Sequence, residues 1–165
     1  MLSAVRLIEL GLPQPACSVL ISPWMDMAVS SYLGGSPTVE SDYLVGGNAS
    51  VPWMASKFVG SIPANSHEVN PLYCSPICIR GINPQLILVG AAEFALYDSK
   101  KWAEVLQVAG IQHKLVIEWG QLHIYAMGSA WVDPAVRAKT ENTIVTWIKQ
   151  WVGRNPGYSG QTIEN

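Results

Sequence analysis

The apolar pattern in the first third of the chain predicts two helices and one strand, separated by loops. Residues Leu2–Leu10 carry an apolar stripe that Gly11 ends, which is typical of the last turns of a helix. Residues Ala16–Ile21 form a short, nearly continuous apolar run, as expected of a strand buried on both faces. A loop rich in Gly, Ser, Pro and Thr is expected over residues 32–48, followed by a helix over about residues 51–59.

The second half of the chain contains a strand, a helix and another strand in succession. Leu86–Val89 is an apolar run that Gly90 ends. Asp98 is expected to cap a helix whose apolar residues recur at spacings of three and four up to Gly110, and Lys114–Glu118 follows as the next strand. Because a helix connects them, the two strands are expected to be parallel, with a right-handed crossover. The pattern therefore predicts an α/β fold.

A long helix is expected near the end of the chain. Asp133 and Pro134 suit the N-cap and the first position of that helix, which should end before Gly153. Its apolar face is formed by Ile144, Ile148, Trp151 and Val152. The remaining residues, 154–165, are polar and are expected to form a frayed tail.

Composition and charge narrow the class of partner. The 165 residues are 49% apolar and 13% charged, which is enough for the core of one globular domain. A net charge of -2 and a pI near 5.9 give no electrostatic reason to expect nucleic acid or an anionic membrane as partner. No stretch approaches the roughly 18 consecutive apolar residues of a membrane span, and residues 1–10 lack the features of a signal peptide. A small, uncharged partner and a cytoplasmic location are expected.

The three cysteines do not indicate a metal site. Cys17, Cys74 and Cys78 leave one thiol over in any disulfide scheme, and the Cys-x3-Cys spacing lacks the paired short knuckles of a zinc site. Buried reduced thiols are the simpler interpretation, at least for Cys17, which lies in an apolar run. The sequence therefore predicts no metal and no cofactor.

Glu93 and His123 are the candidate catalytic residues. Each follows a predicted parallel strand, so both should lie at the edge of the sheet where α/β proteins bind ligands. A carboxylate there can fix the tautomer of an imidazole and stabilise the imidazolium that forms when the other nitrogen takes a proton. Asp98 is the alternative acid, although helix capping already accounts for it. His113 is expected at the opposite edge and His67 in a polar loop, both solvated.

Five segments, in this order and at this spacing, resemble the C-terminal half of the hormone-sensitive-lipase-like α/β-hydrolases. They are Gly11–Pro15, Ser18–Asp26, Asn70–Pro76, Pro84–Asp98 and Trp119–Tyr125. The resemblance covers about residues 1–153 and implies part of an α/β-hydrolase domain, with about three parallel strands and flanking helices. It also implies a carboxylic ester hydrolase without a cofactor, in which His123 is the general base and Glu93, or Asp98, is the acid.

The sequence departs from that family at the nucleophile. It contains neither the Gly-x-Ser-x-Gly elbow nor the His-Gly-Gly oxyanion segment. Ser159 cannot serve, because Gly157-Tyr158-Ser159-Gly160-Gln161 lacks the final glycine and follows no strand. In the family, the helix that ends near Leu10 begins at the nucleophile, so the serine is expected a few residues before Met1. The chain alone is therefore expected to be inactive as an esterase, and the Ala16–Ile21 strand should expose an edge that could pair with another chain.

The resemblance also suggests where the substrate binds. In the family, the segments after the Ser22-Pro23-Trp24 turn help to wall the substrate pocket. The candidates for lining it are therefore Trp24, Met25 and Met27, followed by Trp53, Met54 and Phe58. Together they favour an apolar acyl or alcohol group over a charged substrate, and core packing is the alternative for each. The competing functional hypothesis is a non-catalytic binding or regulatory module derived from a hydrolase half-fold.

Overall fold

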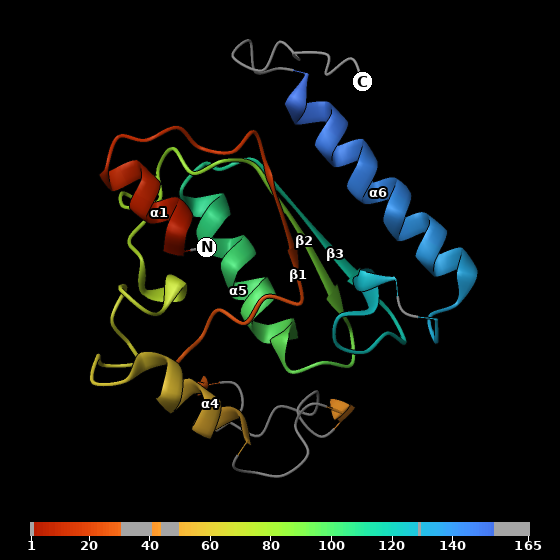
Figure 1. The fold of residues 1–165 in the computed structure, drawn as a ribbon, viewed down its shortest axis with the longest axis horizontal. Coiled ribbons are helices and arrows are strands. Elements are labelled where there is room, and N and C mark those ends of the chain that lie inside the picture. The colour runs from red at the N-terminus through yellow and green to blue at the C-terminus, as the bar shows by residue number, and fades with distance from the viewer. Residues whose placement is uncertain (1, 31–40, 44–49, 129, 154–165) are drawn as a thin grey trace, which may run out of the picture.

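The computed structural model describes residues 2–30, 41–43, 50–128 and 130–153 of the chain (Figure 1). The predicted polar tail, residues 154–165, lies outside the described residues, as does most of the loop predicted over residues 32–48.

Three parallel strands form one sheet. They are β1 (Ser18–Ile21), β2 (Gln85–Gly90) and β3 (His113–Glu118), in the order β1-β2-β3. Every residue of β2 is buried, because β2 has a hydrogen-bonded neighbour on each side. Each residue of β1 is half-buried instead, and within the described part of the chain β1 pairs with β2 alone. The predicted parallel arrangement is confirmed. The expectation that β1 is buried on both faces holds only in part, because Leu20 packs on one face and Val19 and Ile21 on the other, but each of them remains half-buried.

Helices cover both faces of the sheet, and the alternation of β2 side chains decides which face each one meets. On one face, Ile87 packs with α1 (Leu2–Glu9) and α5 (Ala95–Val108). On the other, Leu86 and Leu88 pack against α6 (Pro134–Val152). Figure 1 shows α1 and α5 on one side of the strands and α6 on the other. Two of these contacts come from large aromatic residues, Trp102 of α5 and Trp147 of α6.

The helix α4 (Ser50–Val59) belongs to a separate, smaller cluster. Its buried residues Val51 and Ala55 pack with Val29, Phe94 and Ala95. Two short 3-10 helices, η2 (Pro71–Tyr73) and η3 (Tyr125–Met127), are also present in the described part of the chain. Because Phe94 lies in the loop between β2 and α5 and Ala95 is the first residue of α5, this cluster connects α4 to the segment that follows the central strand.

The start of α5 differs from the prediction. Phe94 precedes the first residue of the helix and makes no side-chain capping bond, so Asp98 lies in the first turn rather than at the N-cap. The carboxylate of Asp98 instead accepts hydrogen bonds from the backbone amides of Met25 and Asp26, at 2.9 and 2.8 Å. Helix capping therefore does not account for Asp98, because its partners are far away in the sequence. At α6 the expectation is confirmed: the Asp133 side chain accepts a bond from the amide of Ala135.

Candidate active site

Glu93 is fully buried in the loop between β2 and α5. Its Oε1 accepts hydrogen bonds from the hydroxyl of Ser22, at 2.9 Å, and from the backbone amide of Gly90, at 2.5 Å. Its Oε2 lies 2.6 Å from Nδ1 of His123. Three polar hydrogens therefore converge on this carboxylate from the ends of all three strands, which compensates for the loss of water on burial.

His123 lies in the loop after β3 and is 9% exposed. The ring of Phe94 stacks on its imidazole, with the centroids 5.4 Å apart and the planes 14° from parallel. The hydroxyl of Tyr43 donates a hydrogen bond to its backbone carbonyl, at 3.2 Å. Contacts to the ring face, to the backbone carbonyl and to Nδ1 thus fix the position of His123.

The contact between Glu93 and His123 determines which imidazole nitrogen can act on a substrate. An ionised carboxylate only accepts hydrogen bonds, so Nδ1 must carry the hydrogen that Oε2 of Glu93 receives. The neutral imidazole then has its lone pair on Nε2. This is the arrangement in which a histidine can take a proton from a hydroxyl while a carboxylate stabilises the resulting cation.

The loop between β2 and α5 (residues 91–94, the acid loop) and the loop after β3 (residues 119–124, the histidine loop) are held close together by backbone hydrogen bonds. The amide of Ala92 donates to the carbonyl of Gln121, at 3.2 Å, and the amide of Ala91 to that of Glu118, at 2.9 Å. A Cβ added at Gly90 would lie 2.3 Å from the Gln121 carbonyl oxygen, a distance that backbone atoms cannot tolerate. Glycine at position 90 is therefore what allows the two loops to approach.

Ser22 links the end of β1 to both of these loops. Its hydroxyl donates to Glu93 and accepts a hydrogen bond from the amide of Ile124, at 2.9 Å. Ser22 has a φ of 45°, an uncommon value for a residue other than glycine, and it is buried. Sequence reasoning treated Ser22 as the end of a strand, although its place at the carboxyl edge of the sheet was a usable signal.

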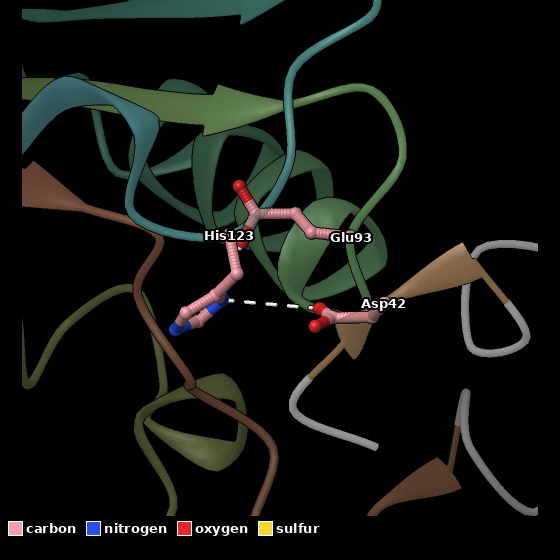
Figure 2. A group of neighbouring side chains, drawn as sticks. All are labelled: Asp42, Glu93 and His123. Atoms are coloured by element: carbon pink, nitrogen blue, oxygen red, sulfur yellow. Dashed lines mark hydrogen bonds and ion pairs between the residues drawn. The ribbon is translucent and has the colours of Figure 1, made fainter. Parts of the chain in front are cut away.

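Asp42 is a second carboxylate at the site that sequence reasoning missed. Its side chain is fully buried, and its Oδ2 accepts a hydrogen bond from the amide of Phe94, at 2.9 Å. The same oxygen lies 3.9 Å from Nδ1 of His123 (Figure 2). Asp42 falls in a polar segment without periodicity, so the sequence carried no signal for its position.

The three side chains of Asp42, Glu93 and His123 also resemble a metal-ligand set, because one ligand atom of each lies within 4.8 Å of the others. The distance between Nδ1 and Oε2 nevertheless fits a hydrogen bond. Two ligands that share an ion at about 2.0–2.2 Å from it would lie about 3 Å or more apart. At 2.6 Å, the observed contact is that of a charge-assisted hydrogen bond.

Asp98, the alternative acid, points to a different set of partners. It bonds the amides of Met25 and Asp26. Burial raises the pKa of Asp98 to about 6; the charge of Asp26 also raises it, while the two amide hydrogen bonds act in the opposite direction. For Asp26 itself, burial opposes ionisation, but hydrogen bonds from Ser30, Asn70 and Ala28 outweigh it and lower its pKa. Of the two candidate acids, Glu93 is therefore the one in contact with His123.

The other histidines lie away from this site. His67 is exposed, as expected. His113 is the first residue of β3, at the opposite end of that strand from His123. The expectation that His113 is solvated is wrong in part, because it is half-buried and its Nδ1 lies 2.9 Å from the carbonyl of Ile111.

A cavity of about 330 Å³ lies beside the segment that follows β1. Its walls include Trp24, Met25 and Met27, together with Leu2, Ser3, Leu20, Pro23, Phe58, Val69 and Pro71. Met25 and Met27 are also largely buried, so they belong both to the core and to the cavity wall. Trp53 is 61% exposed and does not line this cavity. Trp24 connects the cavity to the site, because its ring meets Phe94 edge-on at 5.6 Å and Phe94 stacks on His123.

All three cysteines are free. Cys74 is buried, Cys17 is half-buried and Cys78 is exposed, so the expectation of buried thiols holds fully for Cys74 alone. Burial raises the pKa of the Cys17 and Cys74 thiols. Among the described residues, no helix combines the length and the apolar character that a membrane crossing requires.

Comparison with known proteins supports the resemblance seen in the sequence. A family model described as alpha/beta hydrolase fold matches residues 1–127. A hormone-sensitive lipase from a metagenome library is 28% identical, with a TM-score of 0.79 over 91% of this chain and 49% of its own. The hormone-sensitive-lipase homologue EstE7, also from a metagenome library, is 29% identical, with a TM-score of 0.77 over 90% of this chain and 49% of its own.

The crystal structure of EstE5 that was soaked in ethyl alcohol is 25% identical, with a TM-score of 0.78 over 91% of this chain and 49% of its own. No curated protein matches the sequence. The chain thus spans about half the length of the solved structures it resembles. From the family match and this agreement in structure, the chain belongs to the alpha/beta hydrolase fold family and is similar to its hormone-sensitive-lipase-like esterases.

Proposed function

We propose that this chain provides the histidine and the acid of a carboxylic ester hydrolase. The observation that carries the proposal is the 2.6 Å contact between Nδ1 of His123 and the buried carboxylate of Glu93. Membership of a family whose solved relatives are called esterases and lipases supports the same reaction class.

In this proposal His123 transfers protons at Nε2. It first takes the proton of a serine hydroxyl as that oxygen attacks the ester carbonyl, and then gives the proton to the departing alcohol. In the second half of the reaction it takes a proton from the water that attacks the acyl-enzyme, and it then returns this proton to the serine oxygen as the carboxylic acid leaves. Glu93 holds the ring in the tautomer required and stabilises the imidazolium of each step.

The nucleophile is proposed to come from outside residues 1–165. The sequence contains no Gly-x-Ser-x-Gly motif, and the hydroxyl of Ser22, which contacts this site, bonds Glu93 rather than Nε2 of His123. We infer that the 165 residues alone hydrolyse esters no faster than the background reaction, because the sequence also contains no His-Gly-Gly segment that would supply oxyanion donors. Among the described residues, β1 pairs with β2 alone, so its other edge offers backbone N–H and C=O groups to a further strand, which we propose is supplied together with the nucleophile.

The substrate is proposed to carry an apolar acyl or alcohol group. The cavity beside Trp24, Met25 and Met27 is walled mainly by apolar side chains. One of these residues, Trp24, contacts Phe94, whose ring stacks on His123. An apolar group buried there would leave no charge without a partner. A short acyl ester is therefore the appropriate first probe, and EstE5 crystals have been soaked with p-nitrophenyl butyrate.

The test is to complete the fold and measure hydrolysis. Residues 1–165 would be joined to the N-terminal half of the metagenomic hormone-sensitive lipase, and release of p-nitrophenol from p-nitrophenyl butyrate would be followed. We expect hydrolysis in the completed protein, a loss of at least about 10³-fold in His123→Ala, and little change in His67→Ala, the exposed control. Full activity in His123→Ala would exclude this histidine as the base. A folded completed protein with no hydrolysis and no labelling by a serine-directed fluorophosphonate would reject the proposed function.

A further inference from the structure

Three consecutive residues connect a separate segment of the chain to both loops of the candidate site. The hydroxyl of Ser41 donates to the carbonyl of Ala92, at 3.1 Å. The carboxylate of Asp42 accepts from the amide of Phe94, and the hydroxyl of Tyr43 donates to the carbonyl of His123. The first two contacts hold the acid loop and the third holds the histidine loop.

Asp42 differs from its two neighbours because it brings a charge. Its side chain has no exposed surface, and Oδ2 lies 3.9 Å from Nδ1 of His123. This distance is too long for a hydrogen bond, so the interaction with the ring is purely electrostatic. Away from water, charges at such a distance are weakly screened.

The charge of Asp42 has opposite effects on the two states of the histidine. While the imidazole is neutral, the carboxylates of Asp42 and Glu93 face each other and repel. Once Nε2 has taken a proton, a cation lies 2.6 Å from one carboxylate and 3.9 Å from the other. Asp42 therefore favours the protonated histidine, which exists only part-way through the reaction.

We propose that Asp42 is a positioning residue that acts through His123, holding the acid loop by the amide of Phe94 and stabilising the imidazolium with its buried charge. This inference rests on the proposed function of the site for its effect on turnover. Its effect on the protonation of His123 holds in the chain itself, whatever reaction the site performs.

Three variants separate the charge of Asp42 from its hydrogen bond. Asp42→Asn keeps a side-chain oxygen that can accept from the amide of Phe94 but removes the charge. Asp42→Glu restores the charge on a longer side chain. Ser41→Ala removes a neighbouring loop contact without changing any charge, so it is the matched control.

The first measurement is the protonation of His123 in the 165-residue chain, followed by the ring nitrogen signals of the ¹⁵N-labelled protein as a function of pH. Among the described residues, the ionisable groups that the structure pairs with this imidazole are Glu93 and Asp42. We expect His123 to become half protonated at lower pH in Asp42→Asn than in the wild type, because an anion beside the ring is lost. Asp42→Glu should move this pH back towards the wild-type value, and Ser41→Ala should leave it unchanged.

The second measurement is ester hydrolysis by the completed protein. Because the charge acts on a state that forms only during the reaction, Asp42→Asn should lower kcat by about tenfold and leave KM nearly unchanged. If Asp42→Asn leaves both kcat and the protonation of His123 at wild-type values, or if Ser41→Ala changes them as much, the proposal is overturned. If the protonation shift is present but the completed wild type hydrolyses no ester, the proposed function fails and the effect of Asp42 on His123 stands.

Discussion

Glu93 and Asp98 lie five residues apart, and both carboxylates are buried, yet they have different partners. Glu93 uses one oxygen for Ser22 and Gly90 and the other for His123. Asp98 uses one oxygen for the amides of Met25 and Asp26, and the charge of Asp26 lies nearby. The first carboxylate is joined to a side chain that can change its charge, while the second is joined to backbone that cannot.

The comparison shows that burial of an acid does not by itself indicate catalysis. A buried carboxylate can organise a histidine, or it can hold a chain segment in place at a cost in electrostatic free energy. The raised pKa of Asp98 is a sign of that cost. The partner of the carboxylate, rather than its exposure, separates the two roles.

The strongest test of this difference between Glu93 and Asp98 is to neutralise each carboxylate in the completed protein. Glu93→Gln should lower kcat for p-nitrophenyl butyrate by about 10³- to 10⁴-fold, because the amide no longer fixes the tautomer of His123 or balances its charge. Asp98→Asn should leave kcat within about threefold, because its amide oxygen can still accept from Met25 and Asp26. If Asp98→Asn proves more damaging than Glu93→Gln, the role of the acid belongs to Asp98.

A second change affects the Glu93 side of the comparison alone. Gly90→Ala places a methyl group against the backbone of Gln121, so the acid loop and the histidine loop must separate. We expect a loss of about 2–3 kcal/mol in the free energy of unfolding, measured by urea denaturation, together with a lower kcat in the completed protein. Gly153→Ala is the control, because its Cβ would meet its nearest atom at an ordinary 3.6 Å. Equal stability of both variants would show that the loops do not need this close approach.

A third prediction concerns how the buried charge of Asp98 makes the stability of the fold depend on pH. Burial raises the pKa of Asp98 from its ordinary value of 3.8 to about 6, so between these two pH values the folded state binds more protons than the unfolded state. The contribution of Asp98 to the free energy of unfolding is therefore most favourable below about pH 4. It falls as the pH rises through 6, by up to about 3 kcal/mol. Asp98→Asn removes that cost, so it should be more stable than the wild type near pH 8, with an advantage that disappears towards pH 4. Urea denaturation at several pH values measures it, and an advantage independent of pH would exclude the buried charge as its cause.

Asp98→Ala is the companion to that experiment. It removes the charge and also the acceptor of two buried amides, which should cost about 1–3 kcal/mol. The difference between the alanine and asparagine variants at one pH measures the hydrogen bonds without the charge. Equal stabilities would indicate that the amides of Met25 and Asp26 find water when the side chain is removed.

The parallel strands and the meeting of Glu93 with His123 were predictable because they follow from local rules. An apolar run ended by glycine, then a helix, then a second apolar run defines two parallel strands, and their carboxyl ends share one edge. The same rule could have included Ser22, which directly follows β1. The role of Ser22 was not predicted, because a serine before a proline is also typical of the end of a strand.

The sequence-based predictions fail for residues whose surroundings are formed by segments far away in the sequence. The prediction for Asp98 considered the helix that contains it, but its partners Met25 and Asp26 lie more than 70 residues away in the sequence. Asp42 reaches the site from a segment whose composition predicts only a loop. The half-burial of β1 likewise depends on what lies beside its edge, which an apolar pattern does not record.

The hydroxyl of Ser22 has a consequence for motion. It donates to the acid loop and accepts from the histidine loop while its own backbone amide continues the pairing of β1 with β2. Opening either loop, or the end of β1, on its own would leave a buried polar group without its partner, so the least costly fluctuation is one in which all three segments open at once. The site should therefore exchange its amide hydrogens with solvent as a single cooperative unit rather than loop by loop.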